Sequence, residues 1–344
     1  MVKLADQLKN KFRIKLPGLL YTVILSVLIL LFFYSKLLKN PNSIYFSDKG
    51  DGIRSYYSAL YHIKYDHSFL KFEGMNYPFG EHVMMADTQP LLSFTMKFIS
   101  DHIIDISDYT VGVLNLFMLF SIIIAAIFIY MLLQQFKVGK WYSVLVSCGI
   151  GFLSPQIFRF GGHFSISFVF TIPVLLYLLV KFHKNPSYKK SIIISFYLLI
   201  MGSFHLYNYT FTAFILVFFW LVMLIISKAY RKINFFPGHI FVQVAIPYLI
   251  LNIILVLTDH VIDRTAYPWG FLVYKSDWEG IFLRNAQLNW EWFRDQIHFS
   301  QVEWEGYSYI GIVAKVMFLF IFTIFACIPF ININLTLFVI VFII

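Results

Sequence analysis

Three carboxylates that could do chemistry stand in one polar stretch of the chain, residues 36–108. Asp51 lies between two glycines, and Glu81 and Asp87 follow it within the same stretch. A carboxylate in such a place can remove the proton of a hydroxyl group as a general base, or help to bind a divalent cation. Asp51 also precedes residues 53–69, where apolar residues recur at helical spacing, so it could instead cap the N-terminus of that helix. The sequence leaves both roles of Asp51 open.

The surroundings of these carboxylates indicate a turn and a second helix. Tyr77-Pro78-Phe79-Gly80 has the composition of a tight turn, since proline fixes φ and glycine allows a positive φ. Pro90 favours the start of a helix over residues 91–99, with Asp87 or Thr88 as its N-cap. The carboxylates that could support Asp51 are Asp48, Glu81 and Asp87. They could also be solvated charges of an ordered turn, or Glu81 or Asp87 could face Asp51 as a carboxylate pair.

A short link between two apolar runs carries two basic side chains. Arg159 and His163 are separated there by Phe160 and two glycines. This arrangement suits a phosphate group, because arginine offers a planar set of donors and glycine lets the backbone approach closely. His163 also precedes an apolar run, and the N-terminus of a helix there would favour an anion. Arg159 could instead reach the lipid headgroups.

Two further polar segments add candidate residues. His205 stands in a second link, where it could bind a phosphate or be a hydrogen-bonded residue at the membrane surface. Residues 259–308 contain five tryptophans, Glu305 and Tyr307. Tryptophan and tyrosine are common both on surfaces that bind sugars and in the aromatic belts of membrane proteins. Their number in one stretch favours a surface that faces a substrate.

Long apolar runs must position all of these residues. Hydrophobic residues make up 59% of the 344 residues and charged residues 13%, with a mean hydropathy of +0.73. A soluble domain has roughly 25% charged residues. At about 20 residues for each span, the runs predict an all-α polytopic membrane protein of eight to nine transmembrane helices, forming a single domain over residues 1–344. The net charge of +9 comes mainly from residues at the ends of the spans, so it does not indicate nucleic-acid binding.

The basic clusters predict how the chain crosses the membrane. They occupy residues 3–15, 137–140, 181–190 and 228–232. The positive-inside rule places all of them in the cytoplasm, together with the N-terminus. Residues 36–108 and 259–308 then form outer loops, and residues 53–69 and 91–99 predict juxtamembrane helices in the first loop. The last apolar segment, residues 331–344, is too short to cross the membrane, so we expect a truncated C-terminus.

These features together resemble the GT-C superfamily, polytopic glycosyltransferases that use polyprenyl-phosphate-linked sugars. The chain is most similar to bacterial members whose first outer loop contains Gly-Asp-Gly, and the resemblance covers about residues 16–311. The motifs that carry it are Gly50-Asp51-Gly52, Tyr77-Pro78-Phe79-Gly80-Glu81, Arg159 with Gly162-His163, and Glu305-Gly306-Tyr307-Ser308-Tyr309. Enzymes of this superfamily usually have more spans and often a soluble outer domain, and the chain departs from them in both respects.

The resemblance implies a role for each candidate residue. Asp51 would be catalytic, and the donor phosphate would be bound by Arg159, His163 and His205. Glu305 and Tyr307 would face the sugar or the acceptor. A divalent cation is a possible cofactor, and the chain contains neither a glycine-rich phosphate loop nor a dinucleotide-binding motif.

The sequence therefore predicts an inverting glycosyltransferase that acts on the extracytoplasmic face of the bacterial cytoplasmic membrane, as part of cell-envelope synthesis. Its partners would be a polyprenyl-phosphate-linked sugar, membrane lipid and an acceptor, with no nucleic acid. The alternative is a flippase or transporter for lipid-linked saccharides that carries out no chemistry. Carboxylates are rare inside the apolar runs and cluster in the outer loops, which favours surface chemistry over ion-coupled transport. A structural subunit of a larger membrane complex is a third possibility.

Overall fold

The computed structural model describes residues 16–226, 235–261, 264–265, 280–281, 283, 291–297 and 315–316. Contacts within the chain divide it into two units, Met1–Val261 and Ile262–Ile344. The described part of the second unit includes the short helix α14 (Glu291–Ile297). The helix bundle and most of the candidate residues belong to the first unit.

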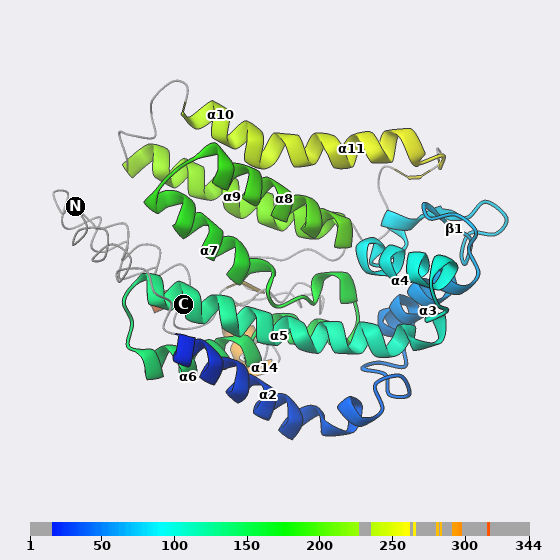
Figure 1. Cartoon of the computed structure of the whole chain (residues 1–344), viewed down its shortest axis with the longest axis horizontal. Coiled ribbons are helices and arrows are strands. Elements are labelled where there is room, and N and C mark those ends of the chain that lie inside the picture. The colour runs from blue at the N-terminus through cyan, green and yellow to red at the C-terminus, as the bar shows by residue number, and fades with distance from the viewer. Residues whose placement is uncertain are drawn as a thin grey trace. The chain divides into compact units, whose positions relative to one another are not determined.

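The first unit is a bundle of helices that lie side by side around α5 (Figure 1). Its long helices are α2 (Leu16–Lys39), α5 (Thr110–Gln135), α6 (Lys140–Phe152), α7 (Thr171–Lys184), α8 (Tyr188–Phe204), α9 (Leu206–Ile226) and α11 (Ile246–Thr258). Short segments join them: α10 (Phe236–Ile240) and a π-helical turn (Phe241–Ala245) before α11, and the 3₁₀ helices η3 (Pro155–Gly161) and η4 (Phe164–Ile166) between α6 and α7. α5 contacts α2, α6 and α7, which makes it the centre of this part of the bundle.

Six helical segments of the described residues are long and apolar enough to cross a membrane. They are Pro17–Lys39, Ser107–Gln135, Lys140–Gly161, Phe164–Lys184, Leu206–Ile225 and Phe236–Thr258. This number is lower than the eight to nine that the sequence predicts. The predicted fifth span forms α8, which has 17 residues and begins with two lysines, so its apolar part is short. The predicted eighth and ninth spans, residues 309–330 and 331–344, fall almost entirely outside the described residues.

Burial along the helices follows the pattern expected of a protein in lipid. α5 carries no charged residue, and its face toward the other helices is closed by fully buried side chains such as Met118, Ile122 and Ala126. On α2 the large side chains of Phe32 and Phe33 are 79% and 70% exposed. An apolar surface of this kind is stable only against lipid or another apolar partner.

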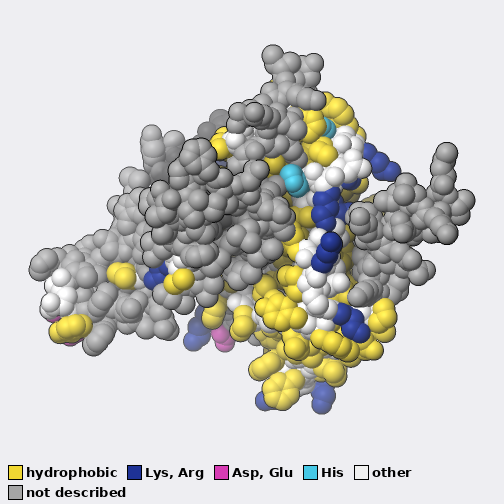
Figure 2. Space-filling model, turned by 90° about the vertical axis from the view of Figure 1, so that its left-hand side faces the viewer, with side chains coloured by type: hydrophobic (Ala, Val, Ile, Leu, Met, Phe, Trp, Pro, Cys, Tyr) yellow, Lys and Arg dark blue, Asp and Glu magenta, His cyan; other side chains and the backbone are white. Residues whose placement is uncertain are grey.

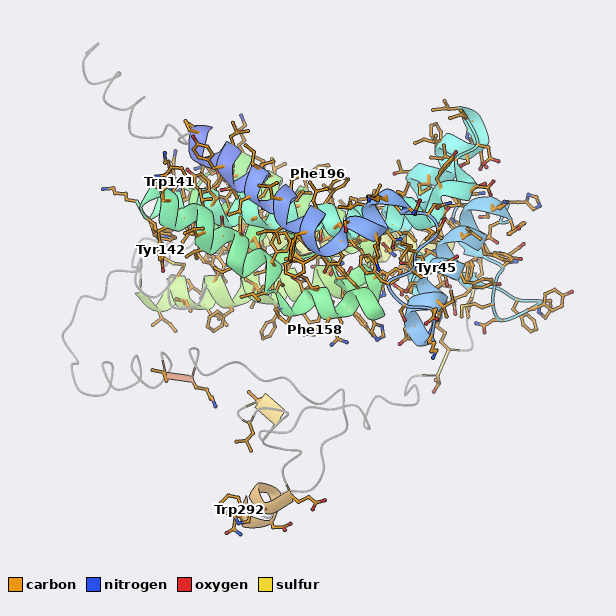
Figure 3. The ribbon with its side chains drawn as sticks, turned by 90° about the horizontal axis from the view of Figure 1, so that it is seen from below. Tyr45, Trp141, Tyr142, Phe158, Phe196 and Trp292 are labelled. Carbon is orange, nitrogen blue, oxygen red and sulfur yellow. The ribbon has the colours of Figure 1, made fainter. Side chains whose placement is uncertain are left out.

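Exposed aromatic side chains stand toward both ends of the bundle. Figure 3 shows Trp141 and Tyr142 near one end, Tyr45 near the other, and Phe196 pointing outward between them. All four are at least 45% exposed. Amphipathic Trp and Tyr side chains at the ends, with Phe between them, are typical of the two interfaces of a membrane protein.

The segment predicted to be the first outer loop folds into two helices and a small hairpin at one end of the bundle (Figure 1). Its elements are α3 (Gly50–Lys64), β1 (Lys71–Phe72), β2 (Glu81–His82), η1 (Val83–Met85), α4 (Pro90–His102) and η2 (Ser107–Tyr109). The two juxtamembrane helices were predicted, but α3 starts three residues earlier and ends five residues earlier than expected. The turn at Tyr77–Gly80 is confirmed and joins β1 to β2, an antiparallel pair that the sequence did not predict.

The predicted helix caps are wrong. The N-cap of α3 is Lys49, whose side chain makes no cap hydrogen bond, and Asp51 is the second residue of the helix. The N-cap of α4 is Gln89, which also makes no side-chain cap hydrogen bond. Thr88 lies one residue before the N-cap position, and its hydroxyl donates to the carbonyl of Val83. Asp87 is likewise engaged elsewhere, in contacts described below.

Among the described residues of the first unit, the carboxylates lie at the end that carries α3 and α4, together with lysines such as Lys64, Lys71 and Lys97, whereas the opposite end carries basic residues without carboxylates. Lysines gather at the end formed by the start of α6, the end of α7 and the start of α8, where Figure 2 shows them in dark blue. The helices α3 and α4 lie at the opposite end (Figure 1). The positive-inside rule predicts that the lysine-rich end faces the cytoplasm.

We predict that a cysteine introduced at the exposed Ser68, between α3 and β1, reacts with a membrane-impermeant maleimide added to intact cells. A cysteine at the exposed Asn185, at the lysine-rich end, should react only after lysis. Cys148 is buried and should contribute little background labelling. The opposite labelling pattern would reverse the orientation. The matching position in the second outer loop, Gln287, lies outside the described residues and should label as Ser68 does.

Candidate functional site

Asp51 and His163 meet at the end of the bundle that carries the outer loop. The distance between Asp51 Oδ2 and His163 Nε2 is 3.2 Å, although 112 residues separate the two in sequence. The side chains are 47% and 41% exposed, so both remain accessible to a ligand. The resemblance to the GT-C superfamily assigned Asp51 and His163 to one site, and this contact brings the two side chains together.

Glycines let the two segments come this close. A Cβ atom on Gly52 would lie 2.9 Å from the carbonyl oxygen of Gly161 and 2.5 Å from Cβ of Ser47. A Cβ atom on Gly162 would lie 3.4 Å from Cβ of Asp51. The backbones on either side of the Asp51–His163 pair are therefore in contact. Gly52 tolerates no side chain at this contact.

Asp87 joins three parts of the chain next to this pair. Its carboxylate accepts hydrogen bonds from the hydroxyl groups of Ser55 on α3 and Ser165 on η4. Ser55 Oγ also lies 3.0 Å from the carbonyl oxygen of Asp51. The backbone carbonyl of Ser165 in turn accepts a hydrogen bond from the amide of Asn208 on α9. Ser55 lies one helical turn after Asp51 on α3, and Asp87 is linked to Asp51 through Ser55. The carboxylates of Asp51 and Asp87 do not form a direct pair.

The other two supporting carboxylates lie apart from this contact. Glu81 Oε1 accepts a hydrogen bond from the backbone N–H of His82, within the hairpin. Asp48 is exposed in the turn that precedes α3. Among the described residues, no group of three histidine, cysteine or acidic side chains could hold a metal ion. The possible divalent cation therefore gains no support from this part of the chain.

His205 is held in its neutral form. It ends α8 in an extended conformation, and its Nδ1 accepts the backbone N–H of Tyr207 at 3.1 Å. Burial lowers the pKa of His205, the charge of Asp87 opposes this shift, and the charge of His163 adds to it. With Nδ1 used as an acceptor, the proton of the neutral ring is on Nε2. His205 can therefore offer a neutral donor, whereas a cationic phosphate ligand would need protonation that its surroundings disfavour.

The predicted anion site at the start of a long helix is absent from this link. His163 has φ +59° and precedes only the three-residue 3₁₀ helix η4, and α7 begins at Thr171. The amide of Gln156 explains the irregular backbone, because its Nε2 donates to the carbonyls of Ile166 and Phe168. Arg159 is exposed on η3, and no hydrogen bond or ion pair holds its guanidinium against the described residues. It is free to turn toward a ligand from solvent.

Sequence reasoning missed Ser55, Ser165 and Asn208. The spacing of Ser55, one helical turn after Asp51, was a usable signal, since residues four apart share a helix face. No comparable signal marks Ser165 or Asn208, whose importance depends on contacts between distant segments. The predicted sugar-facing residues Glu305 and Tyr307 lie outside the described residues.

We predict that Gly52→Ala separates α3 from η3, because its Cβ would lie 2.9 Å from a backbone oxygen that cannot move as a flexible side chain can. The cost should be about 1–3 kcal/mol, as for other overpacked contacts, measured by thermal unfolding in detergent. Gly161→Ala is the matched control, since a Cβ there meets nothing within 4 Å. Equal effects of the two substitutions would contradict the close contact.

We also predict that His205 makes folding sensitive to acid. Its folded pKa is lowered, so the unfolded chain takes up a proton first as the pH falls below the ordinary histidine pKa of about 6.5. The stability that His205 contributes is thus present above that pH and lost below it. His205→Asn keeps an acceptor for the Tyr207 N–H and should flatten the dependence of the melting temperature on pH between about 6.5 and 5. An unchanged pH profile in the variant would show that His205 is not responsible.

Comparison of the sequence with known proteins reveals no activity. No protein of curated function and no solved structure is detectably similar to the chain. One family matches residues 23–343, which covers most of the 344 residues and includes the described site. Its description is a domain of unknown function. The chain therefore belongs to the family of domain DUF6311.

Proposed function

We propose that the protein transfers a sugar from a polyprenyl-phosphate donor to an acceptor hydroxyl group. The exposed Asp51–His163 pair is the observation that carries the proposal. It stands at the end of a bundle of membrane-length helices, where a lipid-linked donor would present its headgroup. The finer features of the proposal are a GT-C-like bundle of eight to nine spans, a cytoplasmic N-terminus and a place in the bacterial cytoplasmic membrane.

The pair can supply the acid–base chemistry of the transfer. The acceptor oxygen would attack the anomeric carbon while the bond from that carbon to the phosphate oxygen breaks. The proton of the acceptor would go to Asp51, whose carboxylate is oriented by His163. The bond electrons would stay with the polyprenyl phosphate, and Arg159 is free to approach its growing negative charge from solvent. Attack opposite the leaving group inverts the anomeric configuration.

The positions of charged residues favour transfer over transport. Among the described spans, α5 and α9 contain no acidic or basic residue, and the lysines of α2, α6 and α7 lie in terminal turns. Ion-coupled transporters usually place ionisable groups near the middle of the membrane. The titratable groups of the candidate site lie instead at one end of the bundle. A flippase for lipid-linked saccharides remains the second candidate.

We predict that Asp51→Asn lowers transfer from polyprenyl-phosphate sugars by at least about a hundredfold, the usual order for loss of a general base. The fold should be preserved, because Asp51 is not the N-cap of α3 and asparagine can still accept a hydrogen bond from His163. The assay measures product formation in membranes that contain the full-length protein. Glu73→Gln is the control, since Glu73 is an exposed carboxylate of the hairpin that pairs with Lys71.

Two results would contradict the proposal. Full transfer activity in Asp51→Asn would remove Asp51 from the mechanism. Movement of lipid-linked sugars across the membrane at the same rate in wild type and variant, with no transfer in either, would support the flippase instead. A variant that lost both activity and thermal stability would be compared with Asp51→Glu, which keeps the negative charge.

A further inference from the structure

A stripe of polar residues runs along the buried side of α3. Asp51, Ser55, Ser58 and His62 are spaced four, three and four residues apart, so they share one face of the helix. Asp51 is exposed at the start of the stripe, and the other three are at most 1% exposed. The stripe begins at the Asp51–His163 pair and continues into the protein.

The stripe faces the start of α4. Ser55 contacts Asp87, two residues before the N-cap Gln89, and the ring of His62 lies 5.8 Å from that of Phe94 on α4. Ser58 lies between Ser55 and His62, as Gln89 lies between Asp87 and Phe94. The two helices pack against each other, and from this spacing we infer that Ser58 and Gln89 face the same part of the interface. We call Ser58, His62 and Gln89 the α3–α4 seam.

The seam contains buried polar atoms that no protein group satisfies. In the described part of the chain these atoms are Ser58 Oγ, His62 Nε2, and both Nε2 and Oε1 of Gln89. Buried polar groups are normally hydrogen-bonded, because burial without a partner is costly. At the other buried polar side chains of the described residues the rule holds, as at Gln243, which donates to Ser191 and accepts from Trp220. The buried polar atoms that lack a partner therefore belong to the α3–α4 seam.

The backbone is strained at the same place. Asp87 and Gln89 both have φ +53°, in the left-handed region that residues other than glycine seldom adopt. Backbone strain tends to accumulate at binding sites and catalytic sites, where the surrounding structure holds it. At Gln89 the strained backbone carries a side-chain amide that has no hydrogen-bond partner from the protein.

The chemistry of the seam suits hydroxyl groups. The Asp66 carboxylate bonds to His62 Nδ1 at 2.8 Å, which leaves Nε2 as an acceptor in the neutral ring. Ser58 and Gln89 add neutral groups that can both donate and accept. The nearby charges are already paired: Asp66 also accepts the N–H of Glu73, and Lys97 bonds to Asp101 and to the carbonyl of Asp66. A phosphate would find no cation there, whereas a hydroxyl group could both donate and accept.

We propose that the α3–α4 seam binds the hydroxyl groups of the transferred sugar, an inference that rests on the proposed function. The donor would lie with its anomeric carbon at the Asp51–His163 pair and its hydroxyl groups toward Ser58 and Gln89, seven residues along α3 from Asp51. The sugar supplies the hydrogen bonds that the seam lacks. Its entry requires α4 to separate from α3 at Gln89 and Ser58, while the hydrogen bond between Ser55 and Asp87 keeps α3 in place.

The first test measures the protein without ligand. Gln89→Met removes two unpaired polar atoms from a side chain of similar length, so the melting temperature should stay the same or rise. Gln243→Met is the matched control and should lower the melting temperature, because it breaks two buried hydrogen bonds. If both substitutions lower the melting temperature equally, Gln89 is already hydrogen-bonded to fixed water in the ligand-free protein, and the proposal is overturned.

The second test measures binding rather than transfer. The probes are polyprenyl phosphates that carry glucose, galactose, mannose or arabinose, and the same lipid phosphate without a sugar. Wild type should bind at least one sugar-bearing lipid roughly tenfold more tightly than the bare lipid, and Gln89→Met and Ser58→Ala should each lose most of this preference. A preference that survives both substitutions, or a wild type with no preference for any of the four sugars, would overturn the seam as a sugar site.

The two tests separate this inference from the proposed function. If transfer depends on Asp51 but the preference for a sugar-bearing lipid does not depend on Gln89, the glycosyltransferase proposal stands and the seam is not the sugar site. If the preference for a sugar-bearing lipid depends on Gln89 and no transfer is detected, the seam is a sugar site and the protein is better described as a flippase. The seam and the Asp51–His163 pair can therefore fail independently.

Discussion

The carboxylate of Asp87 accepts hydrogen bonds from two serines that belong to separate segments, Ser55 on α3 and Ser165 on η4. Asn208 extends the same network to α9 through the carbonyl of Ser165. Buried hydroxyl and amide groups must find partners, so the three segments cannot separate without leaving polar groups unpaired. The position of α3 against the bundle depends on this network, and with it the meeting of Asp51 and His163.

A second buried polar residue fixes the other edge of the outer loop. Asn115 lies in α5, where an unpaired amide would be costly in a membrane. Its Nδ2 donates to the carbonyls of Pro41 and Ile44, and its Oδ1 accepts from the hydroxyl of Tyr56 on α3. Tyr56 is 2% exposed, and its ring packs against Phe164 at 4.6 Å. Asn115 is thus a polar anchor on the central apolar helix, and it orients α3 toward the link that contains His163.

The sequence could predict the features that follow from local patterns. Apolar runs and basic clusters indicated the helical membrane bundle, and the predicted link that contains His205 is confirmed between α8 and α9. The glycines beside His163 were predicted to let the backbone approach a phosphate, and in the structure Gly162 instead lies against Asp51. The role of Asp87 could not be predicted, because it depends on serines brought together from segments 110 residues apart. The same limit explains the wrong caps, since a free Asp87 would have been a good N-cap.

The Asp51–His163 pair adds little to the stability of the fold. Its side chains are nearly half exposed, and exposed ion pairs contribute about 0–1 kcal/mol. The structure nevertheless surrounds the pair with features that are costly for folding: a glycine at position 52 that tolerates no side chain, and positive φ angles at His163 and Asp87. Stability alone does not account for this combination. These features are costly for folding, and they place two accessible titratable groups 3.2 Å apart. The proposed chemical role of Asp51 and His163 explains them better.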